Sequence, residues 1–181
     1  MRIEEEIKLD YSDVLFRPKR STLKSRKEVD LTRTYKFKHS KREWEGVPII
    51  ASNMDGVGEL EVANSLSKFK ILTALTKQHD VNSINNFKPI KAIFNFVALS
   101  CGTSKESYDR LNSIISEHTY VQFICIDVAN GYSENFSHFV ASVREKYPSK
   151  TIIAGNVVTA DMTQELILSG ADIVKVGIGP G

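Results

Sequence analysis

The sequence predicts an α/β fold in which parallel strands alternate with helices. Short apolar runs and amphipathic segments follow one another along the chain, and the pair recurs about every 25–30 residues, as in βα units. Most of the runs are nearly continuous in apolar residues rather than alternating with polar ones. That pattern is typical of strands that are buried on both faces of a parallel sheet.

Six apolar runs are the predicted strands, and four amphipathic segments between them are the predicted helices. The strands are expected at residues 47–51, 71–75, 92–98, 121–126, 151–154 and 173–176. The helices are expected at residues 59–69, 104–117, 134–147 and 160–169. Gly170 directly follows the last helix, where glycine commonly ends a helix.

A (β/α)8 TIM barrel fits this pattern better than a doubly wound sheet. A dinucleotide-binding sheet would show Gly-x-Gly-x-x-Gly after an early strand, but the glycine-dense segment of this sequence, 177–181, follows the last predicted strand. About six βα units are visible, whereas a closed barrel needs eight and about 250 residues. We therefore expect residues 1–181 to form the N-terminal part of one barrel domain, with a basic N-terminal arm at 1–45 and βα units at 46–181.

Composition places the chain among ordinary globular proteins. It has 24 Lys and Arg, 22 Asp and Glu, and 41% hydrophobic residues. Its apolar stretches are far shorter than the roughly 20 residues of a membrane helix, and its acidic N-terminus does not resemble a signal peptide. Two cysteines are too few for a disulfide framework. These features predict a cytoplasmic enzyme or binding module with no membrane partner.

Positive charge is concentrated near the N-terminus. Residues 17–42 hold eleven basic and two acidic side chains, a net charge of +9. Such a segment can attract nucleic acid, but it lacks regularly interleaved aromatic residues and the spacing of a helix-turn-helix or zinc finger. We therefore expect no nucleic-acid partner, and interpret the segment as a solvated arm or as a binding element for the phosphate of a small ligand.

Polar residues follow most of the predicted strands, at the end of the barrel where active sites lie. Lys77, Asp127 and Asn156 are the candidates from these loops. Simpler explanations are also open, since Asp127 could cap a helix or form a turn, Lys77 could be a solvated surface residue, and loops are commonly polar. Cys125 lies within a strand and should be buried, whereas Cys101 lies at a loop and should be better exposed.

Several strings together resemble the reductase branch of the IMP dehydrogenase/GMP reductase family. They span residues 9–26, 53–55, 127–134, 154–159 and 166–181, and the match is looser between 80 and 120. No pair of regulatory CBS domains interrupts the chain after the second strand. The resemblance implies NADPH-dependent conversion of GMP to IMP with release of ammonia. In that chemistry a cysteine thiolate attacks the purine C2, and hydride from NADPH reduces the resulting covalent thioimidate.

The resemblance also implies roles for individual residues. Lys77 and Asp127 are expected at the catalytic centre, and Gly179 and Gly181 as carbonyl ligands of potassium. Ser25 and Arg26 belong to an arm that reaches a cofactor in a neighbouring subunit, so a homotetramer is expected for the full-length protein. The implied NADPH contacts are Ser25, Arg26, Lys77, Asp127, Val128, Ala129, Asn156, Ile178 and Gly179.

Three departures from the family pattern stand out. Gly56 replaces a threonine, and the family's His-Lys-His-Tyr reads Thr-Lys-Gln-His at residues 76–79. The family string Ser-Val-Cys-Thr-Thr-Arg, whose cysteine is the nucleophile, is expected directly after Gly181 and is absent from the sequence. We therefore expect the chain to be inactive alone. The alternatives are an IMP dehydrogenase-like oxidoreductase and a catalytically inactive half-barrel that acts as a binding or assembly module.

Overall fold

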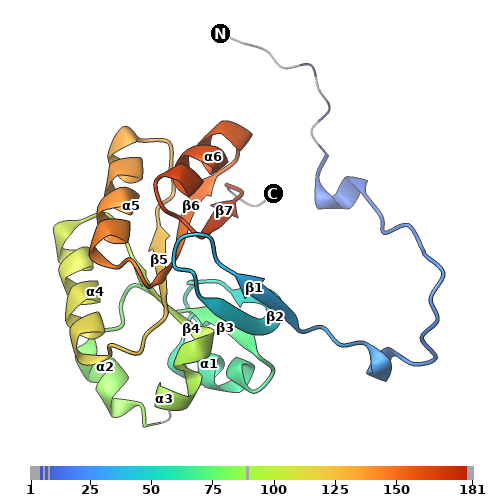
Figure 1. The fold of residues 1–181 in the computed structure, drawn as a ribbon, viewed down its shortest axis with the longest axis horizontal. Coiled ribbons are helices and arrows are strands. Elements are labelled where there is room, and N and C mark those ends of the chain that lie inside the picture. The colour runs from blue at the N-terminus through green and yellow to red at the C-terminus, as the bar shows by residue number, and fades with distance from the viewer. Residues whose placement is uncertain (1–4, 6, 8, 89, 179–181) are drawn as a thin grey trace.

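The structure is a computed structural model that describes residues 5, 7, 9–88 and 90–178. One sheet with the strand order β1-β2-β3-β4-β5-β6-β7 forms its centre (Figure 1). The strands are β1 Arg33–Lys36, β2 Glu43–Ala51, β3 Ile71–Ala74, β4 Val97–Cys101, β5 Phe123–Asp127, β6 Thr151–Val157 and β7 Ile173–Val176. The α-helices are α1 Leu60–Ser67, α2 Val81–Asn86, α3 Ile90–Ile93, α4 Lys105–Glu117, α5 Glu134–Lys146 and α6 Ala160–Leu168. Short 3₁₀ helices are η1 Tyr11–Asp13, η2 Arg26–Glu28 and η3 Phe94–Phe96.

The predicted α/β class is confirmed. Each neighbouring pair from β2 to β7 is parallel and is connected through helix, which is the connection of a βα barrel. In the part of the chain that the structure describes, the sheet is open, with β1 and β7 at its two ends. The fold is therefore a partial barrel with six parallel strands.

The predicted strand at 92–98 is wrong over most of its length. Helices α3 and η3 occupy residues up to Phe96, and β4 begins at Val97. Ile90, Ile93 and Phe94 are all buried, and their spacing of three and one residues places them on one side of a helix. A short apolar run cannot be told from a buried helix by its composition alone, so the sequence pattern favoured the wrong element.

The predicted arm at 1–45 also contains structure that the sequence analysis missed. Within it, β1 and the start of β2 form an antiparallel hairpin, with Arg33 paired to Gly46 and Lys36 to Glu43. Residues 9–32, which precede β1, extend away from the body of the protein (Figure 1). Their charged side chains are exposed to solvent.

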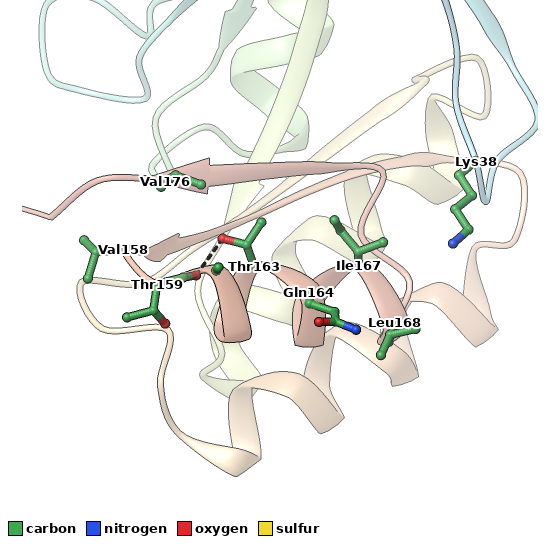
Figure 2. Close-up of a pocket in the computed structure, with 9 residues that line it drawn as sticks. Lys38, Val158, Thr159, Thr163, Gln164, Ile167, Leu168 and Val176 are labelled. Atoms are coloured by element: carbon green, nitrogen blue, oxygen red, sulfur yellow. Dashed lines mark hydrogen bonds between the residues drawn. The ribbon is translucent and has the colours of Figure 1, made fainter.

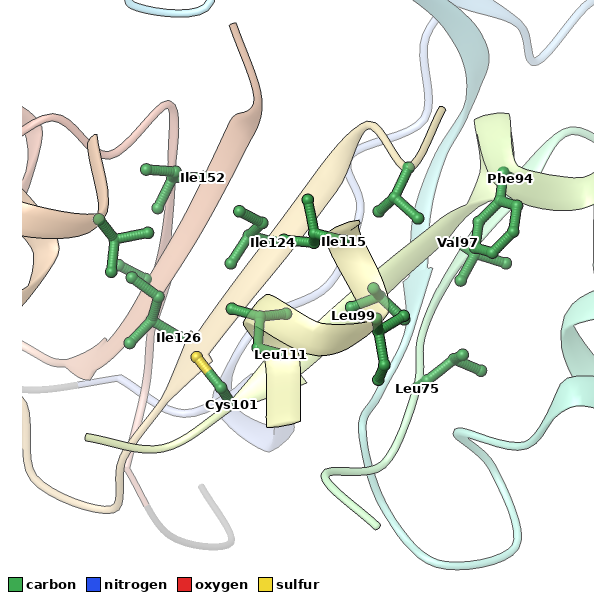
Figure 3. Packing of buried hydrophobic residues seen from close by; sticks show 14 of the residues in the cluster. Leu75, Phe94, Val97, Leu99, Cys101, Leu111, Ile115, Ile124, Ile126 and Ile152 are labelled. Carbon is green, nitrogen blue, oxygen red and sulfur yellow. The ribbon is translucent and has the colours of Figure 1, made fainter. Parts of the chain in front are cut away.

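The sheet separates two apolar clusters. Along β5, Ile124 and Ile126 pack toward the helices, whereas Phe123 and Cys125 pack on the opposite, inner face, because successive side chains in a strand point to opposite sides. Figure 3 shows the cluster under the helices, where α4 covers the strands. The hairpin contributes Phe37 to the inner cluster, with its ring centre 5.9 Å from that of Phe123.

A buried ion pair joins the hairpin to the sheet and to α5. The Asp172 carboxylate, just before β7, is fully buried and pairs with Arg144 Nη2 at 2.6 Å. It also accepts hydrogen bonds from the backbone N–H groups of His39 at 2.8 Å, Ser40 at 3.2 Å and Ile152 at 3.2 Å. One side chain therefore connects the β1–β2 turn, α5, β6 and β7.

None of the helices in the described ranges has the length and apolar character that crossing a bilayer requires.

Asp172→Ala should reduce the free energy of unfolding by about 3–5 kcal/mol, because it leaves the guanidinium of Arg144 without its carboxylate in a buried site. Urea denaturation followed by circular dichroism measures the change. Glu106→Ala is the matched control, since Glu106 pairs with Arg110 on an exposed helix surface and should cost no more than about 0.5 kcal/mol. Equal destabilisation by the two substitutions would contradict the role given to Asp172.

Candidate active site at the carboxyl ends of the strands

Four polar side chains from different strands meet at the carboxyl-terminal edge of the sheet. Asp127 is the last residue of β5, and Lys175 lies in β7. Asn53 and Lys77 are in the loops that follow β2 and β3. Parallel strands end at the same edge, so residues separated by as many as 122 positions lie in contact. We refer to Asn53, Lys77, Asp127 and Lys175 as the charged cluster.

The Asp127 carboxylate is the centre of the charged cluster. Its Oδ2 accepts a hydrogen bond from Asn53 Nδ2 at 3.0 Å and lies 3.4 Å from Lys77 Nζ. Its Oδ1 is in an ion pair with Lys175 Nζ, which also donates to Asn53 Oδ1 at 3.2 Å. Lys77 Nζ additionally donates to the backbone carbonyl of Asp127 at 2.7 Å. The predicted pair Lys77 and Asp127 is thus in direct contact.

The charges of the cluster keep Asp127 ionised. Burial by itself would raise the pKa of the carboxyl, but hydrogen bonds from Lys175 and Asn53 and the charges of both lysines outweigh it and hold the pKa below its ordinary value of 3.8. The carboxylate is therefore ionised at neutral pH, and at acid pH the cluster is lost as the pH falls through this lowered pKa. Two ammonium groups against one carboxylate leave a net positive charge, which favours an anionic ligand.

The loop that carries Lys77 is held from two sides. Arg110 in α4 donates from Nη1 to the carbonyl of Lys77 at 2.8 Å. His79 Nε2 lies 3.3 Å from Glu59 Oε2 and 3.3 Å from the carbonyl of Gly58, which connects this loop to the one after β2. The Lys77 side chain is 39% exposed, so the loop is held in place while part of the side chain remains open to a ligand.

The loop after β5 is bonded to β6. Val128 N–H donates to the Gly155 carbonyl at 2.9 Å, and Asn156 N–H donates to the Val128 carbonyl at 3.0 Å. The Asn156 side chain donates from Nδ2 to the Gly177 carbonyl at 2.9 Å, and Ala129 is exposed. Val128 and Ala129 therefore follow Asp127 directly in the chain, with the Val128 side chain packed against the apolar cluster under the helices. Asn156 is directed to the loop after β7.

The structure does not bring every predicted residue to this site. Ser25 and Arg26 lie in the exposed arm, where the Ser25 hydroxyl caps η2 by accepting from Lys27 N–H at 3.2 Å. Ile178 follows β7 and is 47% exposed. Gly179 and Gly181, the predicted potassium ligands, lie outside the described residues. Among the residues that the structure describes, no group of three or more His, Cys, Asp or Glu side chains is arranged to hold a metal ion.

Cys101 is not the better exposed cysteine that its sequence position suggested. It is the last residue of β4 and is completely buried, like Cys125 in β5. Burial raises the pKa of Cys101 to about 12 and that of Cys125 to about 11. The prediction for Cys101 was wrong because β4 extends through residue 101, where the side chain faces the helices.

Sequence reasoning missed Lys175 and Asn53 as members of the site. Lys175 falls within the apolar run Ile173–Val176 and therefore reads as part of a strand rather than as a loop residue. The alternation of side chains along a strand could have found it. Ile173 packs in the inner cluster and Val174 against the outer one, so Lys175, two residues after Ile173, faces inward. Asn53 belongs to the string 53–55 that resembles the family, but the sequence analysis assigned it no role.

A separate hollow of about 480 Å³ lies between α6 and the β7 edge of the sheet (Figure 2). Ile167 and Leu168 of α6 line it together with Val176 of β7, and Lys38 reaches it from the hairpin. It includes none of the four residues of the charged cluster. We attach no ligand to this hollow.

Parallel strands in sequential order, helices that cover one face of the sheet, and polar groups at the carboxyl ends of the strands are together the features of the α/β-barrel class of proteins. Within that class the relationship is specific. The domain described as IMP dehydrogenase / GMP reductase domain matches residues 8–181, and the chain belongs to that family.

Similar proteins support this assignment. The chain is 55% identical over 183 residues to a GMP reductase of Citrobacter koseri and 55% identical over 183 residues to one of Photobacterium profundum. In both cases the alignment covers 100% of this chain and 53% of the relative, so the chain spans about half the length of the relatives it matches. The crystal structure of an inosine 5′-monophosphate dehydrogenase from Legionella pneumophila has a TM-score of 0.74 and 28% identity, covering 94% of this chain and 50% of that one.

Cys101 and Cys125 should be unreactive in the folded chain. At pH 8 a pKa of about 12 or about 11 leaves almost no thiolate, and burial blocks access to the sulfur. Titration with Ellman's reagent should detect less than 0.1 thiol per chain within minutes under native conditions, and both thiols after denaturation. Rapid native labelling of either cysteine would contradict the burial described above.

Proposed function

We propose that this chain takes part in the NADPH-dependent reductive deamination of GMP to IMP, with release of ammonia, and that it supplies the cofactor-facing part of the active site. Membership of the family supports the reaction class, and the 55% identity to GMP reductases favours the reductase over the dehydrogenase branch. The observation that carries the proposal is the contact between Lys77 and Asp127 at the carboxyl ends of β3 and β5.

The charged cluster fits an anionic dinucleotide. NADPH, when bound, supplies the hydride. The partly exposed Lys77 side chain can donate from Nζ to a ligand oxygen, while the ionised Asp127 and the backbone around Val128 and Ala129 offer acceptors for an amide such as the nicotinamide carboxamide. Asn156 and Ile178 border the same edge of the sheet from β6 and the loop after β7. These residues bind and orient the cofactor in our proposal.

The nucleophile must come from elsewhere than the two cysteines of this chain. Attack on the purine C2 requires a thiolate, and the buried Cys101 and Cys125 are held in the thiol form. The family string Ser-Val-Cys-Thr-Thr-Arg does not occur in the 181 residues. We propose that a segment bearing this string completes the site.

Other expected partners are part of the same proposal. Gly179 and Gly181 would bind potassium through their carbonyl oxygens, which are hard ligands suited to a monovalent cation. Ser25 and Arg26 would contact NADPH of a neighbouring subunit in a homotetramer. The exposure of both residues on an arm that leaves the body supports this intersubunit role.

Isothermal titration calorimetry of the 181-residue chain with NADPH tests the proposal. We expect saturable binding, and Lys77→Ala should weaken it about tenfold or more, because a hydrogen bond to a charged group contributes about 1.5–3 kcal/mol. Lys70→Ala is the matched control, since Lys70 forms its ion pair with Glu45 on an exposed surface and should leave the affinity unchanged.

Absorbance at 340 nm separates cofactor binding from turnover. The 181-residue chain with GMP and NADPH should show no NADPH oxidation, because it has no reactive thiolate. Absence of NADPH binding, or a preference for NAD⁺ over NADPH, would contradict the reductase proposal. GMP-dependent oxidation by the chain alone would overturn the statement that the nucleophile comes from another segment.

A further inference from the structure

Asp127, Gly155 and Lys175 stand in one row across three neighbouring strands. In the parallel register Asp127 of β5 pairs with Gly155 of β6, and Gly155 pairs with Lys175 of β7. Side chains of paired residues point to the same face of a sheet. The outer two residues of the row are oppositely charged, and the middle one has no side chain.

Glycine in the middle position leaves a passage between the outer two residues. A Cβ atom on Gly155 would lie 2.6 Å from Lys175 Cβ and 2.6 Å from its carbonyl oxygen, closer than atoms can approach. Lys175 therefore lies directly against the backbone of β6, and from there its ammonium reaches the Asp127 carboxylate two strands away. Any larger residue at position 155 would therefore collide with Lys175 and displace it.

Lys175 and Lys77 each contact two oxygen atoms of the charged cluster, but the groups that they contact differ. Lys175 Nζ pairs with Asp127 Oδ1 and donates to Asn53 Oδ1 at 3.2 Å, and the Lys175 side chain is 28% exposed. Lys77 is 39% exposed, and its closest contact within the cluster is the backbone carbonyl of Asp127 at 2.7 Å. The two ammonium groups therefore differ in geometry although both face the same carboxylate.

We infer that Lys175 is a positioning residue that passes over Gly155 to hold Asp127 Oδ1 and the Asn53 amide in place, so that Lys77 rather than Lys175 meets the ligand. This inference rests on the proposed function in its last step, because the ligand is taken to be the dinucleotide of that proposal. Its first step, the fixation of Asp127, concerns the protein alone and can be tested without any ligand.

The test is a pH titration of the Asp127 carboxyl in the ligand-free 181-residue chain, in which the ¹³C signal of the Asp127 side chain is recorded. The charged groups that face it are Lys77 and Lys175, and the Cys125 thiol lies on the same strand. Lys175→Met keeps the length of the side chain but removes its charge, so the midpoint should move to higher pH. Lys175→Arg retains the charge and should keep the midpoint close to that of the wild type.

Lys70→Met is the control for a lysine removed from an exposed ion pair and should leave the Asp127 midpoint unchanged. If Lys175→Met does not fold, the lysine ¹⁵N ammonium signals of the wild-type chain test the inference instead. We expect the Lys175 signal to persist at neutral pH because of its hydrogen bonds, and NADPH to shift the Lys77 signal and not that of Lys175. An unchanged Asp127 midpoint in folded Lys175→Met, or rapid exchange of the Lys175 ammonium, would overturn the inference.

The same experiment separates this inference from the proposed function. If the wild-type chain does not bind NADPH, the proposed function fails, whereas the Asp127 titration still reports whether Lys175 fixes the carboxylate. If NADPH binds and shifts Lys175 instead of Lys77, NADPH binding is upheld, whereas the cofactor contact proposed for Lys77 and the assignment of Lys175 as a positioning residue are both wrong.

Discussion

The buried carboxylate of Asp172 determines where β7 lies, and the site depends on that position. Asp172 accepts from the backbone of Ile152 at the amino end of β6 and pairs with Arg144 of α5. Its own N–H donates to the Ile152 carbonyl at 2.8 Å. These bonds set the register between β6 and β7, and three residues further along the same strand that register places Lys175 beside Gly155. An interaction at one end of the sheet thus positions a charge at the other.

The inner face of the sheet changes its chemistry along each strand. On β5, Phe123 and Cys125 pack in the inner apolar cluster, and Asp127 follows on the same side at the carboxyl end. The amino-terminal part of this face is covered by Phe37 and Trp44 of the hairpin, whose rings meet Phe123 edge to face. The apolar part of this face is stabilised by burial, and the charged cluster lies at its carboxyl-terminal edge.

Strand-end reasoning could predict Lys77 and Asp127, because both follow apolar runs at an edge where parallel strands end together. It missed Lys175, because this residue lies inside an apolar run and its approach to Asp127 depends on the register of β6 and β7. Cys101 was misjudged for a related reason, since the end of β4 depends on pairing with β5 rather than on local composition. Local patterns therefore predicted the class of fold and the edge of the sheet where the site lies, while strand pairing determined which residues belong to the site.

The hairpin and α3 illustrate the same limit. β1 lies in a basic segment without an apolar pattern of its own, and it forms a strand because β2 is available to pair with it. The run at Ala92–Phe96 is apolar enough for a strand, but the burial of Ile93 and Phe94 against the helical layer makes it helical. In both cases tertiary contacts outweigh local propensity.

The most direct test of a dinucleotide site at the carboxyl ends of the strands is an NADPH titration of the ¹⁵N-labelled chain, followed by its amide spectrum. We expect the largest shifts at Asn53, Lys77, Asp127–Ala129 and Asn156, with little change in the β1–β2 hairpin. Shifts confined to the hairpin or to the hollow beside α6, or no saturable shifts at all, would contradict the location of the site.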